Sequence, residues 1–202
     1  FFLFKINSLK KMNLLDLMRE SREKLKEHWL IAALICLIYG LLVGLPSELN
    51  TYGNFLSLLL AGPLQLGMSI YFLNIFYDKP ASMENLVEGF KPLLKVLLLY
   101  FVISIFTLFG FILLVIPGII IALGLSMSYY IFIEEPELTI EEILKKSWKL
   151  TEGNKIEIFE LHLRFIPWYL LGILCLFVGI FFVIPWHQLA IVNYYNYLKV
   201  KE

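Results

Sequence analysis

The chain has 202 residues, of which 59% are hydrophobic, 16% aromatic and only 17% charged. Soluble domains carry about 25% charged residues, so this composition excludes an ordinary soluble domain and favours a membrane protein. The 17 Lys and Arg residues balance the 17 Asp and Glu residues, so bulk electrostatics give no case for binding nucleic acid.

All Lys and Arg residues lie in blocks that are separated by long, mostly apolar stretches. The blocks are Lys5–Lys26, Lys79–Lys95, Lys145–Arg164 and Lys199–Lys201. The stretches between them are Glu27–Asp78, Val96–Leu144 and Phe165–Leu198. Each stretch is long enough to cross a bilayer and return, because one helical crossing takes ~20 residues. Basic residues near membrane ends stay cytoplasmic, so we expect a multi-pass protein with both termini in the cytoplasm.

In chain order, the pattern predicts an all-α membrane protein with six transmembrane helices in three hairpins. Residues 1–28 form a cytoplasmic segment, and the hairpins occupy about 29–76, 96–133 and 165–198 of a single domain, 1–202. Pro and Gly favour turns. Turns are therefore predicted at Pro46–Gly53, Ile116–Gly118 and Ile184-Pro185. Cys36 and Cys175 are predicted to be packing residues in the middle of spans.

An interfacial amphipathic helix is predicted before each hairpin, at Asn13–Leu25, Ser82–Phe90 and Thr139–Glu152. The third is the clearest, because Thr139 and Glu142 have capping-box spacing and Gly153 follows as a stop signal. Such helices lie along the lipid headgroups. The pattern indicates three divergent copies of one unit, with Pro63, Pro117 and Pro185 in equivalent places near the turns.

Catalytic and metal-binding patterns are missing from the sequence, which predicts no enzyme, no cofactor and no metal site. The predicted topology places His28 and His162 on the cytoplasmic side and His187 at the opposite turn, so these side chains are not expected to form one site. Neither His-Glu-x-x-His nor Gly-x-Ser-x-Gly occurs. The acidic residues Glu134 and Glu135 are expected to pair with lysines of the next helix, or with a partner.

Amide side chains inside the predicted spans are the candidate polar sites, namely Gln65, Asn74 and Asn193. Such groups usually make hydrogen bonds between helices, worth about 0.6 kcal/mol each, and less often bind a ligand. Small residues allow helices to approach closely. Those in the spans are Gly40, Gly44, Gly62, Gly67, Gly118, Gly124, Gly172 and Gly179.

An ordered set of short motifs resembles a bacterial integral-membrane family catalogued as domain-of-unknown-function family 975. The motifs are Gly62–Gly67, Phe72–Asn74, Ile116–Ile120, Ser128–Tyr130, Pro136, Lys146-Ser147, Gly153, Phe159, Phe165-Ile166, Trp168 and Pro185. The resemblance extends from about Met12 to Leu198 and implies a six-span fold in the bacterial cytoplasmic (inner) membrane. It implies no activity. Arg164 and Pro167 depart from the family pattern beside Trp168.

Two function classes remain open. The first is a non-enzymatic membrane protein that acts through membrane lipids, a protein partner or its own oligomer, in envelope maintenance or tolerance. The alternative is a small transporter or permease component for an uncharged or amphipathic solute, which would need a midplane cavity lined by Gln65, Asn74 or Asn193. A lipid-modifying enzyme would need clustered acids or histidines that the sequence does not bring together.

Overall fold

The computed structural model describes residues 13–49, 51–175 and 178–201, and every regular element within these ranges is a helix. The helices are α2 (Leu14–Leu25), α3 (Trp29–Leu49), α4 (Thr51–Phe76), α5 (Glu84–Glu88), α6 (Leu93–Leu113), α7 (Val115–Leu125), α8 (Ser128–Glu134), α9 (Ile140–Leu150), α10 (Lys155–Leu174) and α11 (Ile180–Lys201). The predicted all-α class is confirmed.

Four stretches of the described chain are long and apolar enough to cross a membrane. They are Trp29–Pro46, Tyr52–Phe76, Leu93–Leu113 and Val115–Glu134, the last of which joins α7 to α8. By length and composition, the first two predicted hairpins are therefore suited to a bilayer. These four stretches are consistent with a membrane protein.

The third predicted hairpin does not reach the same level of apolarity. Helix α10 begins at Lys155 and carries Glu157, Glu160 and Arg164 in its first half. Helix α11 combines apolar residues with histidine, amides and lysines. The described residues thus supply four membrane-length apolar helices where six were predicted.

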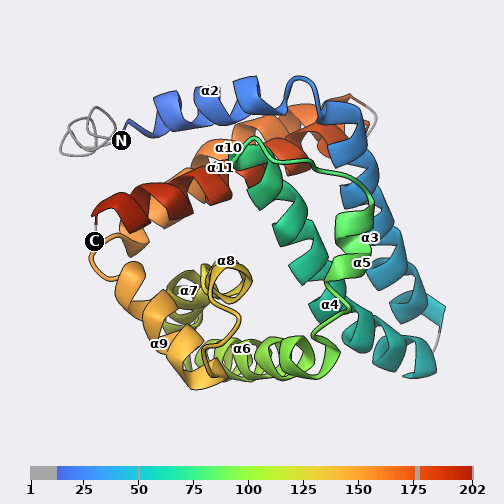
Figure 1. The fold of residues 1–202 in the computed structure, drawn as a ribbon, viewed down its shortest axis with the longest axis vertical. Helices are drawn as coiled ribbons and strands as arrows, with labels where there is room; N and C mark the ends of the chain where they lie inside the picture. Colours follow the sequence, from blue (N-terminus) through green and yellow to red (C-terminus); the bar gives the residue numbers. More distant parts are fainter. Residues whose placement is uncertain (1–12, 50, 176–177, 202) are drawn as a thin grey trace.

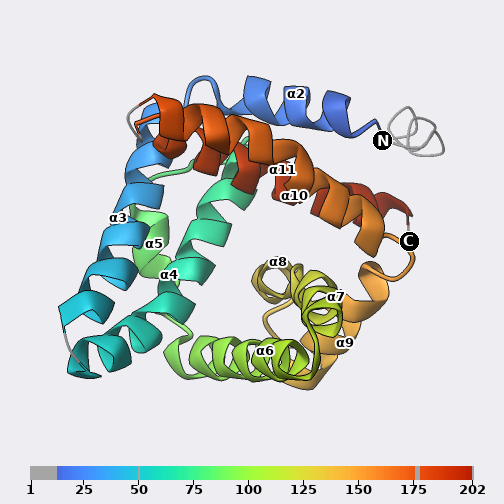
Figure 2. The same ribbon diagram turned by 180° about the vertical axis from the view of Figure 1, so that it is seen from behind.

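Consecutive long helices pair with one another, α3 with α4, α6 with α7, and α10 with α11. Figure 1 shows α2, α10 and α11 side by side along one edge of the molecule, across the ends of α3 and α4. Helix α6 forms the opposite edge, and α9 connects it with the α10–α11 edge. The view from behind shows the same frame, with α7 and α8 inside it (Figure 2).

Helix α11 is largely buried by its neighbours. Most of its residues from Val183 to Leu198 are buried, and it contacts α2, α3, α4 and α10. The apolar stripe of α2, which includes Leu17 and Leu25, is buried against this helix. The indole Nε1 of Trp186 donates a hydrogen bond to the Met18 carbonyl, 2.7 Å away. Protein therefore covers the apolar stripe of α2, where lipid headgroups were expected.

Two of the predicted turns are misplaced. The break between α6 and α7 is at Leu114, whose backbone is extended, and Pro117 lies in the first turn of α7. Proline is tolerated there because the first N–H groups of a helix have no intrahelical acceptor. Helix α10 ends at Leu174 and α11 begins at Ile180, so Pro185 lies inside α11, and Cys175 follows α10 and is exposed. The first turn was predicted at Pro46–Gly53, but α3 continues to Leu49 and α4 begins at Thr51. Residue 50 is outside the described residues.

Glycines bring helices together at several of the predicted positions. A Cβ on Gly67 of α4 would lie 2.5 Å from the Leu86 carbonyl oxygen of α5, and one on Gly172 of α10 would lie 2.8 Å from the backbone nitrogen of Ile180 in α11. Gly40 and Gly44 do not behave this way, since a Cβ there would meet nothing within 4 Å. Pro63 is mid-helix in α4, so the three prolines are not equivalent.

Candidate functional site

The three amides proposed as polar intramembrane sites are not gathered in one place. Asn193 of α11 is buried, and its Nδ2 lies 3.3 Å from both Glu20 Oε2 and Ser21 Oγ of α2. This contact gives Asn193 a structural role, because it joins α11 to α2. Gln65 is half-buried on α4. Asn74, two turns further along α4, lines a polar pocket that neither of the other amides lines.

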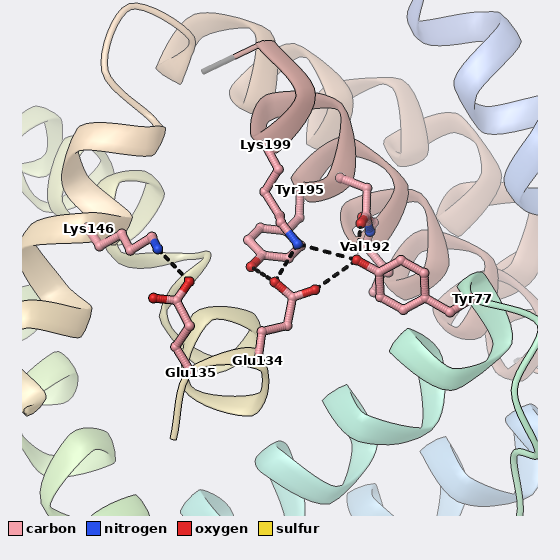
Figure 3. Close-up of polar contacts among 8 residues, drawn as sticks. Tyr77, Glu134, Glu135, Lys146, Val192, Tyr195 and Lys199 are labelled. Atoms are coloured by element: carbon pink, nitrogen blue, oxygen red, sulfur yellow. Dashed lines mark hydrogen bonds and ion pairs between the residues drawn. The ribbon is translucent and has the colours of Figure 1, made fainter. Parts of the chain in front are cut away.

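Beside Asn74, four polar side chains from three elements meet. The Glu134 carboxylate at the end of α8 accepts hydrogen bonds from the Tyr77 hydroxyl at 2.7 Å and the Tyr195 hydroxyl at 2.6 Å. It also pairs with Lys199 Nζ at 2.6 Å. Figure 3 shows the carboxylate at the centre of these contacts. We call Tyr77, Glu134, Tyr195 and Lys199 the Glu134 cluster.

Local geometry explains how each element positions its side chains in the Glu134 cluster. Tyr195 and Lys199 are four residues apart on α11 and so share one helix face. Tyr77 directly follows α4, and Asp78 then turns the chain in the left-handed conformation, with φ of 54°. Tyr195 is only 2% exposed. The carboxylate is thus held between the end of α4 and the buried face of α11.

The Tyr77 hydroxyl faces two acceptors but has one proton to donate. Besides Glu134, it lies 2.6 Å from Asn196 Oδ1. The Asn196 Nδ2 donates to the Val192 carbonyl at 2.9 Å, and this bond sets the orientation of the amide. Burial, and then Glu134, raise the pKa of Tyr77, which keeps its hydroxyl protonated at neutral pH. The two acceptors therefore compete for a single proton.

A pocket of about 480 Å³ opens beside this cluster. Its lining residues are Leu73, Asn74, Tyr77, Lys79, Ile133, Glu134, Glu135 and Lys199. The size is within the range of ordinary small-molecule sites. Glu135 pairs with Lys146 of α9 at 2.5 Å, which confirms the expected pairing with the next helix for this residue. For Glu134 that expectation is wrong, since it pairs with Lys199 of α11. The pocket combines carboxylates, ammonium groups and an amide, so it can hold a small polar group or part of a partner chain.

Two histidines form a pair that was not expected. His162 Nδ1 of α10 lies 2.9 Å from His187 Nε2 of α11, and the Tyr169 hydroxyl lies 2.9 Å from His187 Nδ1. The prediction that His162 and His187 cannot share a site is wrong. Helix α10 begins ten residues before the predicted span and the α10–α11 break precedes Pro185, so the antiparallel pair brings both rings together. In the described part of the chain, no three His, Cys, Asp or Glu residues are grouped to hold a metal ion.

Sequence reasoning missed the Glu134 cluster because its signals pointed elsewhere. Tyr77 and Tyr195 have the positions of interface-anchoring aromatics, and Glu134 was expected to pair with lysines of the next helix or with a partner. The available signal was the i, i+4 pair of Tyr195 and Lys199 beside two buried amides, which is unusual for a helix facing only lipid.

A family model described as "Protein of unknown function (DUF975)" matches residues 103–202. Residues 103–202 belong to this family. The DUF975 region runs from within α6 to the end of the chain and contains Glu134, Tyr195 and Lys199, whereas Tyr77 comes from outside it. The resemblance is confirmed over this region and stays a prediction for the residues before it. No curated protein and no solved structure matches the chain.

Proposed function

We propose that the protein is a non-enzymatic multi-pass protein of the bacterial cytoplasmic membrane that acts through lipid or protein partners, in envelope maintenance or tolerance. The observation that carries this proposal is the apolar surface of α6. Its exposed large residues are Leu93, Leu94, Leu98, Ile105, Phe106, Leu108, Phe109, Phe111, Ile112 and Leu113. Soluble monomers rarely expose an apolar surface this continuous, so lipid or a partner must cover it.

We further propose that six segments cross the bilayer, with both termini in the cytoplasm. They are α3, α4, α6, the stretch that joins α7 to α8, α10 and α11. Support comes from the second half of α10, where Ile166, Leu170 and Leu174 are apolar and exposed, and from the close α10–α11 contact at Gly172. The charges of Lys155, Glu157 and the rest of that first half would then lie at the cytoplasmic boundary. In a four-span arrangement, α10 and α11 instead stay on the cytoplasmic side.

Native Cys175 distinguishes the two arrangements, because it is exposed at the α10–α11 break while Cys36 is buried in α3. With intact cells and a membrane-impermeant maleimide, six spans predict labelling of Cys175 from outside. Labelling only after the membrane is opened would leave four spans. Controls in a Cys175→Ser background are Tyr52→Cys, expected to be labelled from outside, and Lys201→Cys, expected to be labelled only from the cytoplasm.

The alternative function, a transporter component for an uncharged or amphipathic solute, is favoured by one observation, the pocket beside Asn74. Native mass spectrometry of protein released gently from its membrane tests both functions. A reproducible protein partner or defined oligomer supports the interaction role. A monomer that retains one small molecule, and loses it in Asn74→Ala but not in Gln65→Ala, supports transport and contradicts the lead proposal.

A further inference from the structure

A second, larger pocket lies between α6, α7 and α9. It is a groove of about 710 Å³. Its lining residues are Leu98, Val102, Phe106, Ile121, Leu125, Ile140, Glu141, Leu144, Lys145 and Trp148. The walls come from α6 and α7, which both belong to the apolar, membrane-length stretches. Glu141 and Lys145 are the only charged residues among those lining it.

The groove exists because α9 is fixed to α7 at one end. Ser147 Oγ donates a hydrogen bond to the Gly124 carbonyl at 2.8 Å, and Thr151 Oγ1 lies 3.3 Å from the same oxygen. A Cβ on Gly124 would lie 2.4 Å from Cε3 of Trp148, so the indole rests directly on this glycine. These contacts hold the second half of α9 against α7, while Leu144 in the first half borders the open groove.

The charged part of the groove is an ion pair of opposite signs. Lys145 Nζ lies 2.6 Å from Glu141 Oε1, and each side chain is 75% exposed. Glu141 raises the pKa of Lys145 through this hydrogen bond, so the lysine stays charged. A zwitterionic headgroup offers a partner to each charge of this ion pair, whereas a purely anionic headgroup offers a partner to Lys145 alone.

We propose that this groove binds a glycerophospholipid with a phosphate and a primary ammonium in its headgroup. An acyl chain lies along the apolar walls of α6 and α7, the phosphate contacts Lys145 and the ammonium contacts Glu141. The exposed apolar residues Ile105 and Phe109 continue α6 beyond the groove and face the surrounding hydrocarbon. This inference rests on the proposed function for the membrane location, and it specifies the lipid partner.

Trp148 lines the groove and reports its occupancy, because brominated acyl chains quench nearby indole fluorescence. The full chain is placed in phosphatidylcholine vesicles that contain increasing fractions of brominated phosphatidylethanolamine or brominated phosphatidylglycerol. Subtracting the signal of Trp148→Phe isolates this indole from the other tryptophans. We expect half-quenching at about threefold less phosphatidylethanolamine than phosphatidylglycerol, the size of one exposed ionic contact.

Four variants make the result specific. Glu141→Gln removes the partner of the ammonium and should bring the ratio between the two lipids close to one. Lys145→Gln removes the partner of the phosphate, which both lipids carry, and should weaken quenching by both. Val102→Phe should fill the groove and weaken quenching by both lipids. Lys26→Gln breaks the exposed ion pair with Glu23 on α2, outside the groove, and should leave the ratio unchanged.

Equal quenching by the two lipids in the unmodified protein would overturn the headgroup assignment. Absence of Trp148 quenching by either lipid would overturn lipid occupancy, and a second copy of the chain or another protein covering the groove would give that result. Both outcomes are separable from failure of the membrane proposal, because labelling of Cys175 and Tyr52→Cys reports membrane crossing independently of this groove.

Discussion

Replacing Gly67 by alanine tests the close contact between α4 and α5. The added Cβ would lie 2.5 Å from the Leu86 carbonyl oxygen, 2.7 Å from Leu86 Cα and 2.8 Å from the Asn85 carbonyl oxygen. All three atoms are backbone, so no side-chain rotation relieves the clash. On the same surface, a Cβ on Gly89 would lie 2.0 Å from the Pro63 carbonyl oxygen, so α4 and the α5 segment already touch backbone to backbone.

The cost follows from this geometry. The α5 segment must move away from α4, which withdraws the buried Leu86 side chain from the core. Overpacking of a filled contact costs about 1–3 kcal/mol, and the upper part of that range applies because nothing flexible can yield. For a chain of this size, each kcal/mol lowers the Tm by roughly 2–4 °C, so Gly67→Ala should lower it by about 4–12 °C.

Gly40→Ala is the matched control, because a Cβ at this exposed position in α3 would meet nothing within 4 Å. Alanine is favoured over glycine in a helix by roughly 0.5–1 kcal/mol, so this variant should be as stable as the parent or slightly more so. The assay is the fraction of monodisperse protein that survives heating in one detergent, measured by size-exclusion chromatography. Equal Tm values for Gly67→Ala and Gly40→Ala would refute the close contact of α4 with α5.

Two further predictions concern the Glu134 cluster and the start of α9. Glu134→Gln removes the charge that Lys199 Nζ and two tyrosine hydroxyls share, and should cost about 1–3 kcal/mol in the same heating assay, whereas the exposed Glu137→Gln should stay within about 0.5 kcal/mol of the parent. A Glu134→Gln variant as stable as Glu137→Gln would contradict the role of the cluster. Thr139→Ala removes the N-cap of α9 and should cost about 1 kcal/mol, seen as faster hydrogen exchange at the amides of the first turn. Hydrogen bonds from Thr139 lower the pKa of Glu142, so this contribution is present above the usual carboxyl range and is lost as pH falls through the lowered value. If the protection of these amides from exchange stayed constant as the pH falls, the prediction would be contradicted.

Helix α9 shows which parts of the fold can be read from the sequence. Thr139 and Glu142 make the capping box that their spacing predicts, with both reciprocal hydrogen bonds present. Gly153 follows the helix in the left-handed conformation, with φ of 72°. Each of these features is decided within a few residues of the chain, so local chemistry suffices to predict it.

The turn between the last two long helices shows where local chemistry fails. Pro185 is a strong turn signal, yet it lies inside α11. The break occurs earlier, where Gly172 and Gly179 let α10 and α11 touch, with a Cβ on Gly179 placed 2.7 Å from Gly172 Cα. A contact between helices therefore decides the position of the turn, and it also brings His162 to His187.

The Glu134 cluster was beyond sequence reasoning for a related reason. Glu134 is 57 residues from Tyr77, 61 from Tyr195 and 65 from Lys199 along the chain. None of these residues is unusual among its own neighbours, since tyrosines and lysines are ordinary at membrane boundaries. Only the packing of α4 and α8 against α11 reveals that they share one carboxylate.

The polar groups of α11 show how the DUF975 region depends on the rest of the chain. The Trp186 Nε1 donates to the Met18 carbonyl of α2, and the Asn193 amide lies against Ser21 of the same helix. Tyr77, which follows α4, supplies one donor to Glu134. Buried polar groups without such partners cost free energy whether the surroundings are lipid or protein. We therefore expect that residues 103–202 alone do not hold α11 in this place. The hydrogen-bond partners of Trp186 and Asn193 come from the N-terminal half of the chain.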